Sequence, residues 1–479
     1  MTQFRERMEK LKSMIFRKTR RISYFGAGVL FFSFMLHGCV RTGLNDANKT
    51  VISKDTGTNV GISLSSPKLP DTPLSLEQAI EIALSNNPEF SAASHDKRAA
   101  EARYKAARGG MLPKISAVAG YSRYLDNQRL VPARDNGEPG VFGKTIISSD
   151  IVASLPIFTG GRLSAETRAA KLLSLSAGHR LARTEDELVF DVSLVFYSIL
   201  VQERLIESLD FSKKVLQEHL ERVDNLIAAQ KAAKVDRLRT EVRMTDLNQR
   251  SVREKNALIV QNRTLVNLLG FAEMTGSLKL SGMLAEESVI TGEIETHIAQ
   301  ATEHRSDYLA AKSEMAAQAE RVKAAQAQQL PLLSLQGAYG GRWNSDFNDS
   351  EDVGRIGIGM EIPLFQGGQI RAHIIEEQER LLSLNDRLNK FYLRIRLDVE
   401  TAVLNLTTAG ERAQTTKKAI EQARESFRIE SEKYELGKGA IVDVLDAQAA
   451  LLEAETNYYL TLADLNIAAA QLKLAKGEH

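Results

Sequence analysis

The chain has 479 residues, of which 43% are hydrophobic and only 6% aromatic, and Ala, Leu, Glu, Lys, Arg and Gln dominate long stretches. This composition favours extended helices over a compact globule. The net charge of +1 conceals a basic N-terminus: without residues 1–38 the chain has 54 basic and 59 acidic residues, a net charge of −5. A mildly acidic chain without a basic cluster argues against nucleic acid as a partner.

Residues 1–38 are predicted to be a secretory leader. A basic run at 17–21 precedes the apolar run Ile22 to Leu36, which is shorter than the roughly 20 residues that a bilayer-spanning helix needs. The run ends in Leu36-His37-Gly38-Cys39, which resembles the lipobox of bacterial lipoproteins. We therefore expect Cys39 to become the lipidated first residue of the mature protein, with a short anchor and an incidental cysteine as the alternative. Cys39 is the only cysteine, so a disulfide or a cysteine-based metal site is excluded.

After a Ser/Thr/Gly/Pro-rich linker, residues 39–73, the sequence repeats itself. Leu155-Pro156-Ile157-Phe158-Thr159-Gly160-Gly161 is echoed by Ile362-Pro363-Leu364-Phe365-Gln366-Gly367-Gly368, and Gly270 is echoed by Gly477. The repeats are assigned to residues 74–270 and 304–477, and the segment 271–303 between them is assigned to a belt around the helices. The first repeat carries extra residues, which we expect in an exposed loop from Asp126 to Lys144.

Each repeat is predicted to contain two amphipathic strands of about 9 to 11 residues, from a period-two alternation of side chains. The alternation is clearest where Ile147, Ile151 and Leu155 oppose Ser148, Asp150 and Ser154, and where residues 356–364 place isoleucines on one face. Strands of this kind suit a transmembrane barrel with lipid outside and water inside. A soluble antiparallel sheet over a core is the alternative that the strands alone leave open.

Very long helices follow each pair of strands. From Gly161 the chain runs without proline to about Asn225, which corresponds to roughly 100 Å of helix. Two apolar stripes run along this segment, one through Leu188, Val192 and Ile199 and one through Leu194, Val201 and Leu205. Stripes on two flanks indicate that each helix packs between two neighbours, as in a ring of helices; an ordinary helix bundle is the alternative. Four strands cannot close a barrel alone, so strands that span a membrane require several copies of the chain.

Residues 74–477 resemble the TolC family of outer-membrane export channels. The resemblance rests on the helix opening Leu74-Ser75-Leu76-Glu77-Gln78-Ala79, on the two Pro-x-Phe-x-Gly-Gly turns, and most specifically on Gly437-Lys438-Gly439-Ala440-Ile441-Val442-Asp443-Val444-Leu445-Asp446. It implies a mostly helical fold with a β-barrel portion: a homotrimer whose 12-stranded barrel continues into a 12-helix periplasmic tunnel. It also implies a periplasmic adaptor and an inner-membrane transporter as partners, and the cysteine places the chain with the lipid-anchored members in the outer membrane.

The resemblance also supplies candidate site residues at the periplasmic end of the tunnel. Asp443 and Asp446 match an acidic ring at the aperture, where three-fold symmetry would gather six carboxylates that attract cations. The alternative is that an aspartate near a helix start complements the helix dipole. Asp236 and Tyr434 match a network that links the two helical hairpins, so a Tyr434–Asp236 hydrogen bond is predicted. Gly439 stands where an arginine is expected, which leaves open how the closed state is held.

Adaptor docking is expected on the two helical turns, through small and basic residues: Ala232, Lys234, Gly437, Lys438 and Gly439. The same residues could instead form ordinary connecting loops. We expect no enzyme activity, cofactor or metal site, because the eight histidines are scattered and no nucleophile or phosphate-binding motif is found. The main alternative function is a periplasmic coiled-coil adaptor lipoprotein, which would need neither the four strands nor a second helical hairpin.

Overall fold

The computed structural model of the chain describes residues 73–131, 141–230, 232–272, 278–286, 293–343 and 350–478. The predicted leader, Cys39 and the linker up to residue 72 lie outside the described residues. Within the described ranges, no helix combines the length and the apolar character needed to span a bilayer.

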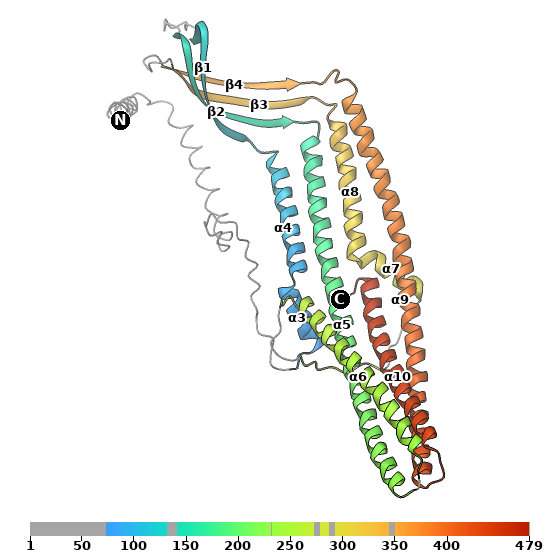
Figure 1. The fold of residues 1–479 in the computed structure, drawn as a ribbon. Helices are drawn as coiled ribbons and strands as arrows, with labels where there is room; N and C mark the ends of the chain where they lie inside the picture. Colours follow the sequence, from blue (N-terminus) through green and yellow to red (C-terminus); the bar gives the residue numbers. More distant parts are fainter. Residues whose placement is uncertain are drawn as a thin grey trace, which may run out of the picture. The chain divides into compact units, whose positions relative to one another are not determined.

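The structural elements follow one another in the same order twice (Figure 1). The first series is α3 (Leu76–Asn86), α4 (Pro88–Gly109), β1 (Lys114–Val131), β2 (Val141–Phe158), α5 (Arg162–Ala228) and α6 (Lys234–Leu268). The second is α7 (Ile294–His304), α8 (Ser306–Ala327), β3 (Leu332–Trp343), β4 (Ser350–Glu361), α9 (Gln369–Glu435) and α10 (Ile441–Lys476). The predicted succession of helix, two strands, very long helix, turn and long helix is therefore present in both halves of the chain.

Local sequence signals account for the helix boundaries. Ser75 caps α3 in a reciprocal arrangement with Gln78, and Asn87 caps α4, which begins with Pro88 at its first position. The two long helices each start directly after a glycine in the left-handed region, Gly161 with φ 86° and Gly368 with φ 83°. A residue with a side chain is strained in that conformation, so the Gly-Gly pairs fix where the strands turn into the helices.

The four strands form one antiparallel sheet in the order β1-β2-β3-β4. Their register aligns the predicted apolar faces, because Ile151 pairs with Tyr339 and Leu335 with Ile358. Ile151, Tyr339 and Ile358 are about 60% exposed or more. The opposite face is polar and includes an ion pair between Arg342 and Asp150 at 2.7 Å. The sheet of the single chain therefore has one solvent-exposed apolar face and one polar face.

The predicted loop from Asp126 to Lys144 is wrong at both ends. The strands β1 and β2 each have 18 residues, against 12 in β3 and in β4, and they include residues 126–131 and 141–144. Register shifts between Arg123 and Gln128 and between Arg129 and Val131 accommodate the extra residues. The insertion therefore lengthens a hairpin through bulges, which add residues to one strand without ending the pairing. In the second repeat, Ile362 and Leu364 lie beyond the end of β4.

The helices form a wall with two levels. Next to the sheet the neighbours run α4, α5, α8, α9, and farther from it α6, α5, α10, α9 (Figure 1). The first predicted stripe on α5, with Leu188, Val192 and Ile199, packs with α3 and α6 residues. The second stripe divides, since Leu194 packs against that same cluster, while Val201 and Leu205 pack with Ala463 of α10. This confirms that α5 packs between two helices rather than in a two-stranded coiled coil.

Candidate functional site

The helical wall has two different faces. The segment between the repeats crosses one of them: Asn466 of α10 exchanges hydrogen bonds with Ala285, at 3.2 and 3.1 Å, and Lys417 of α9 pairs with Glu286 at 2.6 Å. Asp446 lies 20 residues before Asn466, about five and a half helical turns, and so points away from this segment. We call the side with Asp446 the open face and the side with Ala285 the belt face.

The predicted aperture residues lie at the far end of the wall from the sheet. Asp443 and Asp446 are both exposed, three residues apart on the first turns of α10. Asp443 also accepts a hydrogen bond from the backbone N–H of Ala440 at 3.4 Å, and Asp236, at the matching position of α6, does the same with Ala233 at 3.3 Å. Both aspartates therefore stabilise the start of their own helix, which gives the alternative interpretation of these residues a geometric basis.

The predicted hydrogen bond between Tyr434 and Asp236 is not formed. Among the described residues, the buried Tyr434 hydroxyl has no hydrogen-bond partner, and the Asp236 carboxylate faces the N-terminus of its own helix instead. Burial, and then the charge of Asp236, raise the pKa of Tyr434, so the carboxylate acts on the Tyr434 hydroxyl through its charge and not through a hydrogen bond.

Other contacts, which the sequence did not reveal, join the two helical hairpins. Arg222 of α5 pairs with Glu435 of α9 at 2.6 Å, and Gln448 of α10 donates to the backbone carbonyl of Ser212 at 2.9 Å in a buried position. The apolar side chains Leu216, Val223, Val444 and Leu445 pack between the same helices. Polar side chains therefore help to hold α5 against the second hairpin near its tip, namely Arg222, Glu435 and Gln448.

His219 lies within this contact. Its ring is 6% exposed, lies 6.4 Å from the Tyr434 ring in an edge-on arrangement, and has an Nδ1 atom without a partner among the described residues. Burial lowers the pKa of His219; Arg222 lowers it further, while Glu435 and Glu218 act in the opposite sense. The imidazole is therefore held neutral between α5 and α9.

We expect acid to loosen the contact between α5 and α9. Above the usual histidine pKa of about 6.5, His219 is neutral whether the helices are packed or apart. As the pH falls below that value, the separated state takes up the proton first, so packing loses free energy until the pH reaches the lowered pKa of the packed state. Hydrogen exchange of the α9 tip at pH 7.5 and 5.5, corrected for intrinsic rates, should show this loss in the wild type and not in His219→Gln. The exposed His304 provides the control, since His304→Gln should keep the wild-type response.

The two helical turns are built alike. Gly437 lies two residues beyond the end of α9 and has φ 69°. Its N–H donates to the carbonyl of Tyr434 and that of Lys438 donates to the carbonyl of Lys433, both at 2.9 Å, which is a Schellman motif. In the first repeat Gln230 takes the equivalent left-handed place at φ 56°. Gly439 lies tight against α9, where a Cβ would come within 3.1 Å of the Lys433 Cβ. A large side chain at 439 therefore requires the turn to shift.

One group of side chains in the described ranges could hold a metal ion, His373, Glu376 and Glu377 on the first turns of α9. Arg380 pairs with both glutamates, at 2.6 and 2.7 Å, and Gln318 donates to the buried Glu377 at 2.5 Å. A metal ion would have to displace the Arg380 guanidinium, so these residues form an ion-pair cluster.

The family model of outer membrane efflux proteins matches residues 79–271 and 297–478. The chain belongs to this family. It is 22% identical over 402 residues to the outer membrane protein TolC of Vibrio cholerae, covering 82% of this chain and 89% of the relative. It is 23% identical to the cobalt-zinc-cadmium resistance protein CzcC of Cupriavidus metallidurans (86% and 91% covered) and 27% identical to the pyoverdine export outer membrane protein OpmQ of Pseudomonas putida (84% and 86% covered).

Solved structures show the same fold. The outer membrane protein VceC of Vibrio cholerae superposes with a TM-score of 0.71 at 17% identity, covering 84% of this chain and 96% of that one. A membrane protein from Pseudomonas aeruginosa gives 0.73 at 21% identity, covering 84% and 93%. The chain is thus an outer-membrane efflux channel component with a TolC-like fold, and the adaptor alternative is not supported. Its relatives are channel proteins and not enzymes.

Proposed function

We propose that three copies of the chain close into a 12-stranded barrel and a 12-helix tunnel, which serve as the passive exit duct of a tripartite efflux or type I secretion system. One observation carries this proposal: among the described residues, the wall ends at every level in two edges that have no partner within the chain. The edge strands are β1 and β4, and the edge helices are α4 or α6 on one side and α9 on the other. Unpaired strand edges are not tolerated in lipid, so copies that join edge to edge satisfy the barrel and the tunnel together.

Apolar side chains on the edge helices support this closure. Leu393, Leu397 and Leu404 of α9 are 60–66% exposed and lie opposite its core-facing side, which contains the fully buried Ile395 and Val399. The edge helix α6 has a similar exposed stripe on the side opposite Leu247 and Leu265: Val235, Leu238, Val242, Val252, Ile259 and Val260. Contiguous exposed apolar stripes mark interaction surfaces, and the α9 stripe of one copy suits the α6 stripe of the next.

The sheet fits the same assembly. In a closed barrel its exposed apolar face, which includes Tyr121, Ile151 and Ile356, would contact lipid, while the Arg342–Asp150 pair would line a water-filled interior. The open face of the helical wall would then line the tunnel, and the belt face would lie outside. Asp443 and Asp446 of three copies would meet at its periplasmic mouth and form a cation-attracting ring.

The proposed assembly includes lipidation of Cys39 in the outer membrane, a periplasmic adaptor at the helical turns and an inner-membrane transporter. The names of two relatives connect one with cobalt, zinc and cadmium and the other with pyoverdine. Relatives of similar identity thus handle unlike cargo, which is consistent with a shared conduit whose transporter selects the substrate.

Conductance measurements test whether the protein forms a duct. We expect the purified mature protein to insert into planar bilayers and give discrete conductance steps, and to migrate as a heat-modifiable oligomer on a gel. The proposal would be refuted if the protein stayed monomeric and soluble without detergent and gave no conductance steps in bilayers.

The docking role of the turns can be separated from their folding role at Gly437. The Gly437→Gln variant reproduces the Gln230 of the first turn, and a Cβ at 437 meets no atom within 4 Å. The left-handed conformation then costs about 1 kcal/mol, too little to unfold the hairpin. If the adaptor docks here, export should fall sharply while the amount of oligomer in the membrane stays unchanged, as measured by a drug-susceptibility assay beside a gel of membrane fractions. Loss of the oligomer would show that the glycine is only structural.

A further inference from the structure

Charge is unevenly distributed over the polar face of the sheet. The register aligns three successive rows of this face across the four strands: Lys114, Ser154, Gln336 and Gly357; then Ser116, Val152, Ala338 and Arg355; then Val118, Asp150, Gly340 and Val353. Arg355 belongs to this face because successive residues of a strand alternate, and its neighbour Ile356, which is 81% exposed, lies on the apolar face. These rows thus contain two cations, Lys114 and Arg355, and one acid, Asp150.

The acid of these rows already has a partner. Arg342, from the row beyond, pairs with Asp150 at 2.7 Å. Arg355 is exposed, and its guanidinium forms no ion pair or hydrogen bond with another described residue. The register places Glu351 two rows from Arg355 and opposite Arg342, and Glu361 three rows away in the other direction. The charge of Arg355 is therefore not balanced within its own row or the two adjoining rows.

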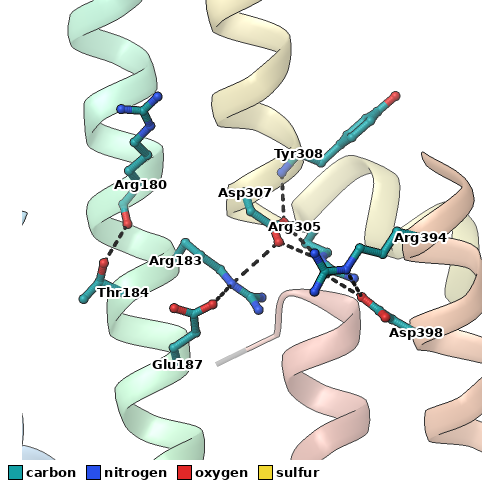
Figure 2. Close-up of polar contacts among 9 residues, drawn as sticks. All are labelled: Arg180, Arg183, Thr184, Glu187, Arg305, Asp307, Tyr308, Arg394 and Asp398. Atoms are coloured by element: carbon teal, nitrogen blue, oxygen red, sulfur yellow. Dashed lines mark hydrogen bonds and ion pairs between the residues drawn. The ribbon is translucent and has the colours of Figure 1, made fainter. Parts of the chain in front are cut away.

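Figure 2 shows, for comparison, how arginines of the helical wall are neutralised. Arg183 pairs with Glu187 at 2.7 Å, and Arg305 pairs with Asp307 at 2.9 Å. In such pairs the carboxylate occupies the guanidinium and cancels its charge. A guanidinium that no carboxylate occupies, like that of Arg355, remains positively charged at any physiological pH and is available to an anion from solution.

Short side chains leave space around Arg355. Ala338 lies opposite it on β3, and Gly357 follows two residues later on β4, where an added Cβ would meet nothing within 4 Å. Gly340 lies in the adjoining row. A long side chain among such short ones extends away from the sheet, so an anion can approach its guanidinium from the solvent.

Under the proposed function this face lines the water-filled barrel, and the inference rests on that assembly. Three-fold symmetry then places three Arg355 side chains at one height inside the barrel. Rings of arginine or lysine attract anions in pores, as rings of aspartate or glutamate attract cations.

We propose that Arg355 of the three copies forms an anion-binding collar inside the barrel, where the guanidinium groups draw in small anions. Binding is weak because the groups are exposed to water, and weak binding suits a conduit, since an ion must leave a site as readily as it enters. With Asp443 and Asp446 at the periplasmic mouth, the duct then has fixed charges of opposite sign at its two ends.

Reversal potentials of the purified mature oligomer in planar bilayers, in a potassium chloride gradient near 0.1 M, test the collar. Arg355→Gln should raise the ratio of cation to anion permeability about twofold, while Arg355→Lys should keep the wild-type ratio because the charge remains. Arg123 provides a matched control: it pairs in register with Thr145 and shares the apolar face with Tyr121, outside the proposed barrel. Arg123→Gln should therefore leave the ratio unchanged.

Chemical modification separates the charge of Arg355 from any effect on folding. Cys39 is the only cysteine of the chain, so Arg355→Cys offers one further target to thiol reagents. A methanethiosulfonate that carries an ammonium group should return the permeability ratio of this variant to the wild-type value, and one that carries a sulfonate should raise the ratio further. The same reagents should leave the wild type unchanged.

The outcomes distinguish the collar from the duct itself. The collar would be overturned, and the duct would stand, if normal pores kept one permeability ratio in the wild type, in Arg355→Gln and in both modified forms of Arg355→Cys. The same conclusion would follow if neither reagent could reach the cysteine from the lumen. A wild type that forms no pores would instead refute the duct, and the collar with it.

Discussion

Replacing Leu393 and Leu404 together with glutamate should abolish the oligomer while the single chain still folds. Both side chains are exposed in the protomer, at 66% and 60%, so charges there cost little before assembly. In the proposed ring the same positions are buried against α6 of the next copy, where an unpaired carboxylate costs several kcal/mol. Chemical cross-linking and heat-modifiable migration should report monomer only, and conductance should disappear with the oligomer.

The neighbouring Asn405 gives a matched control for this prediction. It is exposed on α9, but it lies about a quarter turn from Leu404, outside the apolar stripe. Asn405→Glu adds the same charge to the same helix and should leave the oligomer intact. If the double variant assembled as well as Asn405→Glu, the stripe on α9 would not be the contact between copies, and edge-to-edge closure would lose its support.

The fold was largely predictable because local sequence signals mark the structural elements, and the second half of the chain repeats the signals of the first half. The Gly-Gly turns mark where α5 and α9 begin, and the long runs without proline that follow them indicate very long helices in both halves of the chain. The first hairpin was harder: after Ser122 the side chains of β1 are mostly polar. Alternation then carries little information, and the sequence resembles a loop although its backbone pairing continues through bulges.

The polar contacts of the site were less accessible to sequence. The Asp236 carboxylate has two possible hydrogen-bond donors: a tyrosine on another helix and the N–H of Ala233, three residues away. It accepts from the local donor, because that hydrogen bond does not depend on how the helices pack. The pairing of Arg222 with Glu435 depends on the exact stagger of α5 against α9 over more than 200 positions of sequence. Heptad patterns identify the packed face of a helix, but they do not fix that stagger.

Removing the charges of Asp443 and Asp446 should sharply weaken the cation preference of the channel. Both side chains are exposed at the start of α10, and in the proposed trimer they supply six carboxylates at one mouth. An asparagine in place of Asp443 retains an oxygen that can accept the N–H of Ala440, so Asp443→Asn with Asp446→Asn should not unravel the helix. If the ring stabilises a cation at the mouth by about 1 kcal/mol, the ratio of cation to anion permeability should fall roughly fivefold. Reversal potentials in a potassium chloride gradient measure this ratio.

Glu421→Gln tests whether any lost charge has the same effect. This glutamate is exposed on α9 and lies one helical turn from Lys417, the residue that pairs with the belt, so it faces outward in the proposed assembly. The substitution removes one negative charge from each copy without touching the mouth, and the permeability ratio should stay at the wild-type value because exposed charges are screened beyond about 10 Å of salt solution. If the double aspartate variant kept the wild-type ratio too, the aspartates would serve only the starts of their helices. The selectivity of the duct would then have to arise elsewhere along the open face.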